Sequence, residues 1–157
     1  MSKATRATRV LDAAGVGYRL HPYDYEAEAS AKGVQAAQAL GAPPQCVLKT
    51  LMAWVDDRPV CAVIPCDRRL QLKKLAAACG GKAARMMEVP EAERRSGYKV
   101  GGISPLGQQR PVPVLIEAAA LHEGQLYLNA GQRGLLLELA AANILEVLQA
   151  RACDLCE

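Results

Sequence analysis

Residues 46–55, CVLKTLMAWV, carry the pattern that decides the fold. Successive side chains of a strand point to opposite faces, so Lys49 falls on one face and Thr50 on the other. Their companions are all apolar: Val47, Leu51, Ala53 and Val55 beside Lys49, and Leu48, Met52 and Trp54 beside Thr50. A strand that is apolar on both faces is typical of a central, covered strand. We therefore expect a sheet with packed layers on both sides of this segment.

Lys49 stands out within that strand because an ammonium loses hydration free energy among apolar neighbours. A lysine held there needs an anion or a hydrogen-bonding partner, which is the pattern of a functional lysine. The alternative is a lysine near the strand end whose stem packs on apolar side chains while its ammonium reaches water.

Turn and cap signals on either side predict a mixed arrangement of helices and strands. Asp56-Asp57-Arg58-Pro59 reads as a turn, and residues 60–65 as the returning strand of a β-hairpin. Helices are expected over 3–14 with Ser2 as N-cap, from Ser30 to Gly41, from Asp67 to Gly80, from Val89 to Gly97, and over 140–149. Further strands are expected near 18–20, 83–87, 112–117, 125–129 and 135–139. Short turns between strands favour a mixed sheet over a doubly wound parallel one.

Length and composition predict a single domain over residues 1–157. With 51% hydrophobic and 22% charged residues and no run of 18 apolar residues, the chain reads as soluble rather than membrane-spanning. The polar beginning lacks the apolar segment of a signal peptide, which favours a cytoplasmic location and reduced thiols. We accordingly expect Cys46, Cys61, Cys66 and Cys79 to be core or near-core residues.

Positive charge concentrates in the middle of the chain. Nine basic residues lie between Arg68 and Lys99, against three acidic ones. This segment suits a polyanionic partner such as the end of an RNA stem. The alternative is a solvated helix face.

Several common sites are not indicated. The two histidines, His21 and His122, are not at ligand spacing from cysteines, and we predict no metal and no cofactor. Cys153 and Cys156 have C-x-x-C spacing, but they lack a second pair and fall in a segment expected to be mobile, so we interpret the pair as incidental. Motifs of P-loop, dinucleotide-binding and serine-hydrolase sites are absent.

A glycine loop supplies the second decisive motif. Residues 98–107, YKVGGISPLG, place Gly101 and Gly102 before Ser104 and Pro105. Adjacent glycines admit positive φ and let main-chain N–H groups approach a ligand carbonyl or phosphate closely. The alternative is a tight loop between two strands.

Taken together, the Lys49-Thr50 pair, the glycine loop and Gly131-Gln132-Arg133-Gly134 resemble the YbaK/EbsC family of bacterial aminoacyl-tRNA deacylases. That family is related to the editing domain of prolyl-tRNA synthetases, and the resemblance extends from about Tyr18 to Leu148. It implies a curved, partly closed mixed β-sheet flanked by helices. It also implies hydrolysis of mischarged tRNA in trans, above all of Cys-tRNA(Pro), without a cofactor. The implied partners are the acceptor end of the tRNA and prolyl-tRNA synthetase.

The resemblance carries roles to individual positions. Those matched as catalytic are Lys49, Gly101 and Gly102. Those matched as substrate-binding are Tyr23, Thr50, Ser104, Asn129, Gly131 and Arg133. An activated ester needs donors at the developing oxyanion and a placed attacking group rather than a strong nucleophile. In relatives that act on cysteinyl-tRNA, the thiol of the substrate is thought to assist.

Three departures from the family pattern leave the amino acid open. An aromatic residue is usual at Lys32, a small hydroxyl residue at Asn129 and an acidic residue at Leu136. Alanine or serine on tRNA is therefore an alternative to cysteine. A non-catalytic module that docks on tRNA or on a synthetase is an alternative of another class, but such a module has no reason to hold a lysine in an apolar strand.

Overall fold

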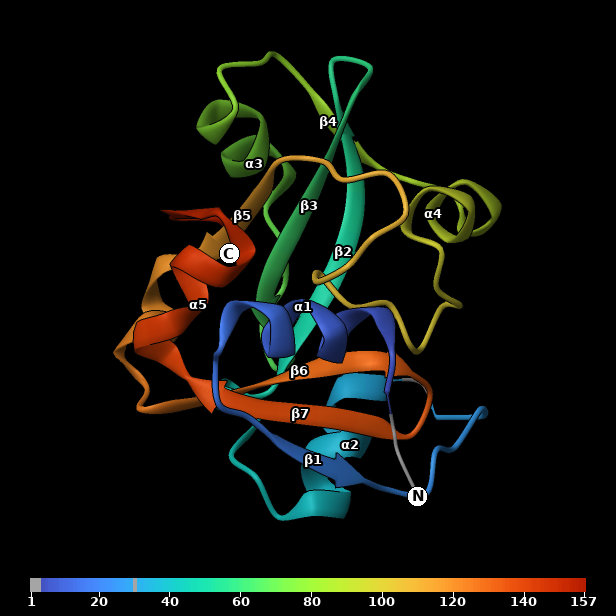
Figure 1. The fold of residues 1–157 in the computed structure, drawn as a ribbon. Coiled ribbons are helices and arrows are strands. Elements are labelled where there is room, and N and C mark those ends of the chain that lie inside the picture. Colours follow the sequence, from blue (N-terminus) through green and yellow to red (C-terminus); the bar gives the residue numbers. More distant parts are fainter. Residues whose placement is uncertain (1–3, 30) are drawn as a thin grey trace.

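The strands are divided between two sheets in the computed structural model, which describes residues 4–29 and 31–157 (Figure 1). The three-stranded sheet has the order β1-β7-β6 and the five-stranded sheet the order β4-β2-β3-β5-β8. The strands are β1 (Arg19–Pro22), β2 (Leu48–Val55), β3 (Arg58–Pro65), β4 (Ala84–Met86), β5 (Val114–Glu117), β6 (Gln125–Gln132), β7 (Leu135–Ala140) and β8 (Ala150–Cys153). Pairings are antiparallel except β3–β5 and β5–β8, which are parallel. The mixed class is confirmed, and the strands expected in one curved sheet lie in two, linked by a bridge between Val47 and Tyr127.

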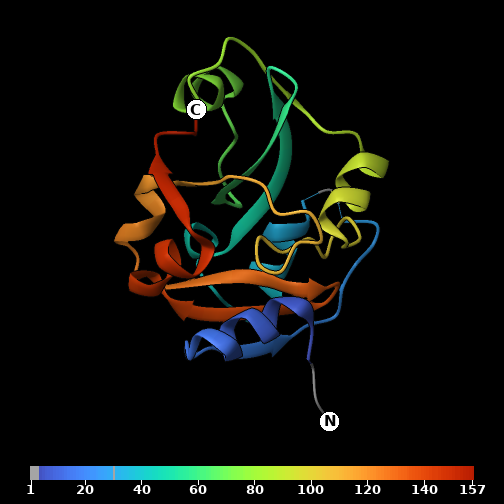
Figure 2. The same cartoon turned by 45° about the horizontal axis from the view of Figure 1, so that its top comes forward.

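Five α-helices within the described residues cover these sheets: α1 (Arg6–Ala14), α2 (Lys32–Leu40), α3 (Leu72–Ala78), α4 (Val89–Ser96) and α5 (Ala141–Leu148). Short 3₁₀ helices span Pro44–Cys46 and Ala118–His122. Figure 2 shows α1 and α2 on opposite sides of the three-stranded sheet. Leu11 of α1 shares a buried cluster with Leu128 and Leu137, while Ala36 of α2 shares another with Leu136. None of the helices in the described ranges is long and apolar enough to cross a membrane.

The β2–β3 hairpin supplies two adjacent inner strands of the larger sheet. It pairs from Leu48 with Pro65 to Val55 with Arg58. Asp56 and Asp57 have φ angles of 48° and 71°, the left-handed conformation of a two-residue turn whose twist matches that of the strands. Met52 packs into the cluster shared with the smaller sheet, and Leu51 packs against the cluster on the other face. Both faces of β2 are covered, as its sequence predicts.

The first two helices begin later than predicted. The first begins at Arg6, after Thr5, because the side chains of Thr5 and Thr8 each accept a hydrogen bond from the backbone N–H of the other. The second begins at Lys32, after Ala31, which makes no side-chain cap bond. The predicted caps Ser2 and Ser30 lie outside the described residues.

Residues 150–157 pack along the five-stranded sheet, and the prediction of mobility there is wrong. The Gln71 N–H donates to the Leu155 carbonyl at 2.8 Å, and the Glu157 N–H donates to the Arg69 carbonyl at 3.0 Å. These pairings and the bridge between Leu70 and Cys156 hold residues 69–71 against the end of the chain, so α3 begins at Leu72 rather than after Asp67. Leu155 and Cys156 are fully buried.

All six cysteines are free thiols. Cys46, Cys61 and Cys66 are buried, which confirms the prediction for these three. Cys79 is half-buried and packs against the cluster on the α3 side of the sheet. Burial raises the pKa of the Cys156 thiol to about 12.

Candidate active site

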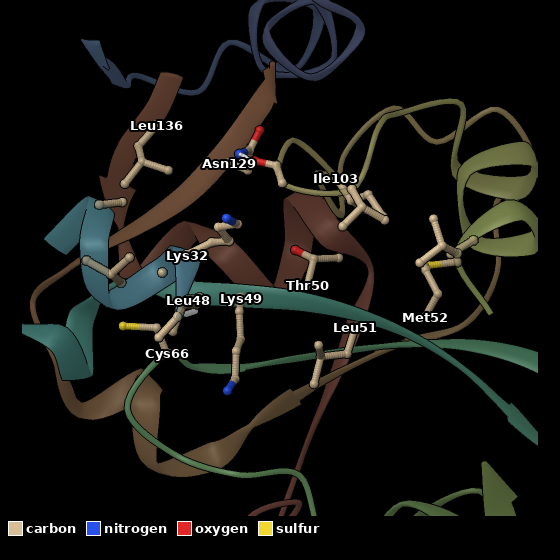
Figure 3. A pocket seen from close by; sticks show the side chains of 18 of the residues that line it. Lys32, Leu48, Lys49, Thr50, Leu51, Met52, Cys66, Ile103, Asn129 and Leu136 are labelled. Atoms are coloured by element: carbon tan, nitrogen blue, oxygen red, sulfur yellow. Dashed lines mark hydrogen bonds between the residues drawn. The ribbon is translucent and has the colours of Figure 1, made fainter. Parts of the chain in front are cut away.

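A cavity of about 430 Å³ opens between β2, α2, the glycine loop and the β4–α4 segment (Figure 3). It is lined by five of the nine residues predicted as catalytic or substrate-binding: Tyr23, Lys49, Thr50, Gly101 and Asn129. The other four, Gly102, Ser104, Gly131 and Arg133, do not line it. The structure therefore separates the predicted set into cavity residues and residues around them.

The cavity has three parts. Leu136 and Cys66 lie at one end and Ile103 and Met52 at the other, with Thr50, Lys32 and Asn129 between them (Figure 3). We call the first part the small end (Gly33, Ala36, Val47, Cys66 and Leu136). The polar centre consists of Lys32, Thr50, Gly101 and Asn129. The methionine end consists of Met52, Met86, Met87, Val89, Ala92 and Ile103.

Thr50 lines this cavity and carries an unsatisfied polar atom. Its hydroxyl oxygen is buried and has no hydrogen-bond partner within residues 4–29 and 31–157. A buried polar group left unpaired costs about 1–3 kcal/mol. Such a group beside a cavity is suited to a ligand that supplies the missing hydrogen bond.

Gly101 brings backbone to the polar centre. Its φ of +92° lies in the left-handed region, and a Cβ there would collide with the hydroxyl of Tyr25. Its carbonyl accepts a hydrogen bond from Asn129 Nδ2 at 3.1 Å. Its N–H makes no hydrogen bond to any residue that the structure describes. Only glycine fits this position, and it leaves one backbone donor unused.

Gly102 and Ser104 have structural positions. A Cβ on Gly102 would lie 2.9 Å from the backbone nitrogen of Arg133, and the Gly102 N–H already donates to the Lys99 carbonyl at 2.7 Å. Ser104 is fully buried, and its hydroxyl oxygen accepts the N–H of Leu106 at 3.2 Å. Neither residue lines the cavity, and the hydrogen bonds of both residues stabilise the conformation of the glycine loop.

The turn between β6 and β7 holds that loop. Asn129 Oδ1 accepts the N–H groups of Gly131 and Gln132 at 2.7 and 3.1 Å, while its Nδ2 reaches Gly101. Gly131 has a φ of +94°, and a Cβ there would lie 2.7 Å from the Tyr98 ring. Arg133 Nε donates to the Val100 carbonyl at 2.9 Å. Asn129 and Arg133 thus position the glycine loop, although the sequence resemblance gave them contacts with substrate.

Lys49 lines the cavity, but its ammonium points to the opposite side of β2 from Thr50 (Figure 3), as strand alternation requires. The residue is half-buried, and it makes no hydrogen bond or ion pair within the described part of the chain. The charge lies near Cys66: burial and Asp67 raise the pKa of that thiol, Lys49 lowers it, and the result is about 11. β4 pairs with β2 only from Ala53 to Val55, so β4 does not cover this edge of β2 at Lys49.

Lys32 and Tyr25 meet at the rim of the cavity. Lys32 Nζ donates to the carbonyls of Glu26 and Ala27, and it lies 5.4 Å from the centre of the Tyr25 ring. The Arg133 guanidinium lies 5.5 Å from the same ring. Sequence reasoning missed Tyr25, because its contact with Gly101 joins two segments far apart in the chain and leaves no local pattern.

Six of the nine basic residues expected to bind RNA have side-chain partners among the described residues: Arg68, Lys74, Arg85, Arg94, Arg95 and Lys99. Lys74 Nζ donates to Asp154 Oδ1 at 3.0 Å and to the Cys156 carbonyl at 2.8 Å. Arg68 donates to the Glu157 carbonyl at 3.2 Å. These two cations hold residues 154–157 against the sheet.

The described residues contain no group of three or more histidine, cysteine, aspartate or glutamate side chains placed to hold a metal ion. The cavity lining likewise includes no aspartate or glutamate among the residues that the structure describes. The polar groups at its centre are neutral donors and acceptors together with the ammonium of Lys32.

Residues 27–147 match the family model described as the aminoacyl-tRNA editing domain. The chain belongs to this family. The expected activity class, hydrolysis of the aminoacyl ester on tRNA, is thereby confirmed.

Similar proteins agree with this assignment. The chain is 34% identical over 145 residues to the "Putative Cys-tRNA(Pro)/Cys-tRNA(Cys) deacylase EbsC" of Enterococcus faecalis, covering 91% of this chain and 87% of that protein. It is 32% identical over 76 residues to the proline–tRNA ligase of Thermosipho africanus, covering 48% of this chain and 14% of the ligase. A crystal structure described as a "putative trans-editing enzyme for prolyl tRNA synthetase" superimposes with a TM-score of 0.84 at 25% identity, covering 99% of both chains.

Proposed function

We propose that this protein hydrolyses mischarged tRNA in trans, with Cys-tRNA(Pro) as its substrate. The observation that carries the proposal is that Thr50, whose hydroxyl is unpaired, and Gly101, whose N–H is unpaired, line one cavity of the described chain. The names of the similar proteins supply the tRNA and the amino acid.

The small end fits the side chain of the amino acid. Ala36, Val47, Cys66 and Leu136 are buried there and leave an apolar wall without a carboxylate. The α-ammonium of the substrate therefore has no anionic partner at Leu136. Alanine and serine are small enough for the same space, so the choice among the three amino acids is a matter for direct assay.

The chemistry needs no nucleophile from the protein. Burial raises the pKa of Cys66, the one thiol among the described cavity residues, to about 11, so this thiol stays protonated and unreactive at neutral pH. Attack then comes from water or from the thiol of the cysteinyl group. The Gly101 N–H and the Thr50 hydroxyl are the donors that would stabilise the oxyanion as it forms.

Lys49 takes part by moving around the edge of β2. Its ammonium has no partner among the described residues, and β4 does not block the passage at this position. Four methylene groups give the side chain the reach and the rotational freedom for this movement. In the substrate complex, its ammonium would contact the ribose or the phosphate next to the ester.

The same proposal places the protein in the cytoplasm, where tRNA is charged. It also makes prolyl-tRNA synthetase a partner, since a synthetase that releases mischarged tRNA would supply the substrate.

A panel of charged tRNAs tests the proposal. Cys-tRNA(Pro), Ala-tRNA(Pro), Ser-tRNA(Pro) and Pro-tRNA(Pro) are incubated with the protein, and the release of each amino acid is measured. We expect Cys-tRNA(Pro) to be hydrolysed fastest and Pro-tRNA(Pro) to be spared. Faster release of alanine or serine would overturn the choice of cysteine, and no release from any of them would overturn the function.

A matched variant ties the activity to the cavity. Thr50→Val keeps the shape of the side chain but removes the hydroxyl. We expect kcat to fall by about 10- to 100-fold, which is less than the fall of about 10²–10³ that follows removal of a strong oxyanion donor. Full activity in this variant would remove Thr50 from the site.

A further inference from the structure

The glycine loop contains a turn whose central peptide unit has two possible orientations. The Gly102 N–H donates to the Lys99 carbonyl at 2.7 Å, which closes a β-turn, and Gly101 has a φ of +92°. The third residue of a type II turn has a φ of about +80°, whereas that of a type I turn has about −90°. The two types differ by a flip of the central peptide unit, and glycine admits both signs of φ. Gly101 alone therefore does not decide which way its N–H points.

A charged side chain holds the carbonyl of this central unit. Arg133 Nε donates to the Val100 carbonyl at 2.9 Å, and Arg133 is not among the described residues that line the cavity. In a trans peptide the C=O and the N–H point in opposite directions, so the Gly101 N–H points away from Arg133. A donor bound to the carbonyl of an amide also polarises it, which strengthens its N–H as a donor.

A second charged side chain holds Val100 at its other polar group. Glu93 Oε2 accepts the Val100 N–H at 2.8 Å. The Glu93 side chain is 25% exposed, and its Oε1 lies 3.9 Å from Lys99 Nζ. Since α4 ends at Gly97, this hydrogen bond ties the glycine loop to the helix that precedes it (Figure 1). A hydrogen bond to a carboxylate is roughly twice as strong as one between neutral groups. Val100 is thus held at both its N–H and its C=O.

We propose that Glu93 is a positioning residue for deacylation, which together with Arg133 fixes the Val100–Gly101 peptide so that the Gly101 N–H serves as the oxyanion donor. This proposal rests on the proposed function and adds a residue to its machinery. Glu93 is not among the described residues that line the cavity, so it acts through Val100. Without Glu93, Val100 is held at its carbonyl alone and the peptide unit is free to flip. The flipped unit presents a carbonyl oxygen in place of the N–H, and that oxygen repels an oxyanion.

Two variants of Glu93 separate the hydrogen bond from the rest of the side chain. Misplacement of a catalytic group by about 1 Å costs about 10²-fold in rate, so we expect Glu93→Ala to lower kcat for Cys-tRNA(Pro) by about 10- to 100-fold with little change in KM. Glu93→Gln keeps an oxygen that can accept the Val100 N–H, and its kcat should stay near that of the wild type. An unchanged kcat in Glu93→Ala, or an equal fall in Glu93→Gln, would overturn the proposal.

Glu91→Ala is the matched control. Glu91 lies on the same helix and its side chain is also 25% exposed, but it pairs with Arg94 and Arg95 instead of the glycine loop. Its loss should leave kcat and KM as in the wild type. A fall in kcat equal to that of Glu93→Ala would show that the rate responds to any damage to α4, and the positioning role would be wrong.

A double variant tests whether Glu93 acts through the glycine. In Gly101→Ala the backbone donor is already displaced, so adding Glu93→Ala should lower kcat little further. Residues that act on one group are expected to be non-additive in this way. A further fall as large as that of Glu93→Ala alone would show that Glu93 acts elsewhere.

Amide spectra of the isotope-labelled protein without substrate distinguish this proposal from the proposed function. The Val100 N–H should exchange slowly with solvent in the wild type and fast in Glu93→Ala, where the Gly101 amide resonance should also shift. Glu91→Ala should change neither, and an unmoved Gly101 resonance in Glu93→Ala would overturn the proposal. If the wild type hydrolyses Cys-tRNA(Pro) and Glu93→Ala keeps its kcat, the positioning role is wrong and the proposed function stands. If the spectra change as expected but no charged tRNA is hydrolysed, the proposed function is wrong and the hold of Glu93 on Gly101 is supported.

Discussion

Buried polar groups are unpaired on one face of the five-stranded sheet and hydrogen-bonded on the other. On the cavity face, the Thr50 hydroxyl and the Gly101 N–H have no partner within the described chain. On the opposite face, which we call the strap face, the buried carboxylate of Glu117 accepts N–H groups from Ala119, Leu155 and Cys156 at 2.9–3.0 Å. Because an unpaired buried group costs stability, the first face is built for a ligand and the second for the fold.

The lysine variant is the sharpest test of this division, since Lys49 belongs to the strap face by geometry and to the cavity by our proposal. We expect Lys49→Ala to reduce deacylation to background. Stability should change little, because the ammonium has no partner among the described residues. Deacylation of Cys-tRNA(Pro) and the thermal unfolding midpoint are measured on the same preparation. Retained hydrolysis would assign Lys49 to the strap face.

The glycine variant tests the cavity face alone. Gly101→Ala introduces a Cβ against the Tyr25 hydroxyl at a φ of +92°, which displaces the backbone donor. We expect kcat to fall by about 10²–10³, the usual loss for one oxyanion donor, with a much smaller change in tRNA affinity. Gly124→Ala is the control, since a Cβ there meets nothing within 4 Å. Equal rates for the two variants would mean that the loop is only a turn.

The carboxylate variant tests the strap face. Glu117→Gln removes the charge that three backbone N–H groups share, so we expect a loss of about 1–3 kcal/mol in the free energy of unfolding. Urea titration at pH 7 measures it. The kcat for Cys-tRNA(Pro) should remain near that of the wild type, and a large loss of kcat without a loss of stability would contradict the division between the faces.

The pH dependence of stability follows from the same carboxylate. Burial raises the pKa of Glu117, but its N–H donors outweigh burial, and the net pKa is lowered. A lowered folded pKa gives stability that is present above the unfolded value of about 4.3 and is lost as the pH falls through the folded pKa. Between pH 5 and 2 the wild type should therefore lose more unfolding free energy than Glu117→Gln, and parallel curves would contradict this.

The smallest effect concerns the basic residues near α3. The affinity for tRNA falls with salt, and the slope of log K against log[salt] measures how many phosphates the protein neutralises. In Arg69→Gln/Lys73→Gln this slope should become shallower by about 0.7–0.9 for each phosphate that these cations neutralise in the wild type. Arg68→Gln/Lys74→Gln should instead lower the unfolding midpoint, because these cations hold residues 154–157. An unchanged salt slope in the first variant would show that Arg69 and Lys73 form a solvated face.

Local patterns predicted most of the secondary structure. The double-sided apolar pattern of β2, the turn at Asp56 and Asp57, and Gly97 at the end of α4 depend on neighbours in sequence, and the structure contains all three. Residues 150–157 were mispredicted because their order depends on Glu117 and Gln71, which lie far away in the chain. Pairings of that kind leave no periodicity to read.

The candidate site was predicted in part. The resemblance indicated nine positions but not which of them face the cavity, because Gly101 and Gly102 are alike in sequence and differ only in the fold, where Gly101 has a φ of +92° and an unpaired N–H while the Gly102 N–H donates to the Lys99 carbonyl. The methionine end was missed as well, since Met86 and Val89 precede and begin α4 without a motif. The catalytic and binding roles themselves stay predictions until the variants are assayed.

The contact between Tyr25 and Gly101 has a consequence for evolution. A smaller residue at position 25 would remove the collision with a Cβ at position 101, but it would leave the φ of +92°, which strains any side chain there. Position 25 is therefore expected to vary among related sequences while position 101 keeps glycine. The constraint between the two positions runs in one direction only.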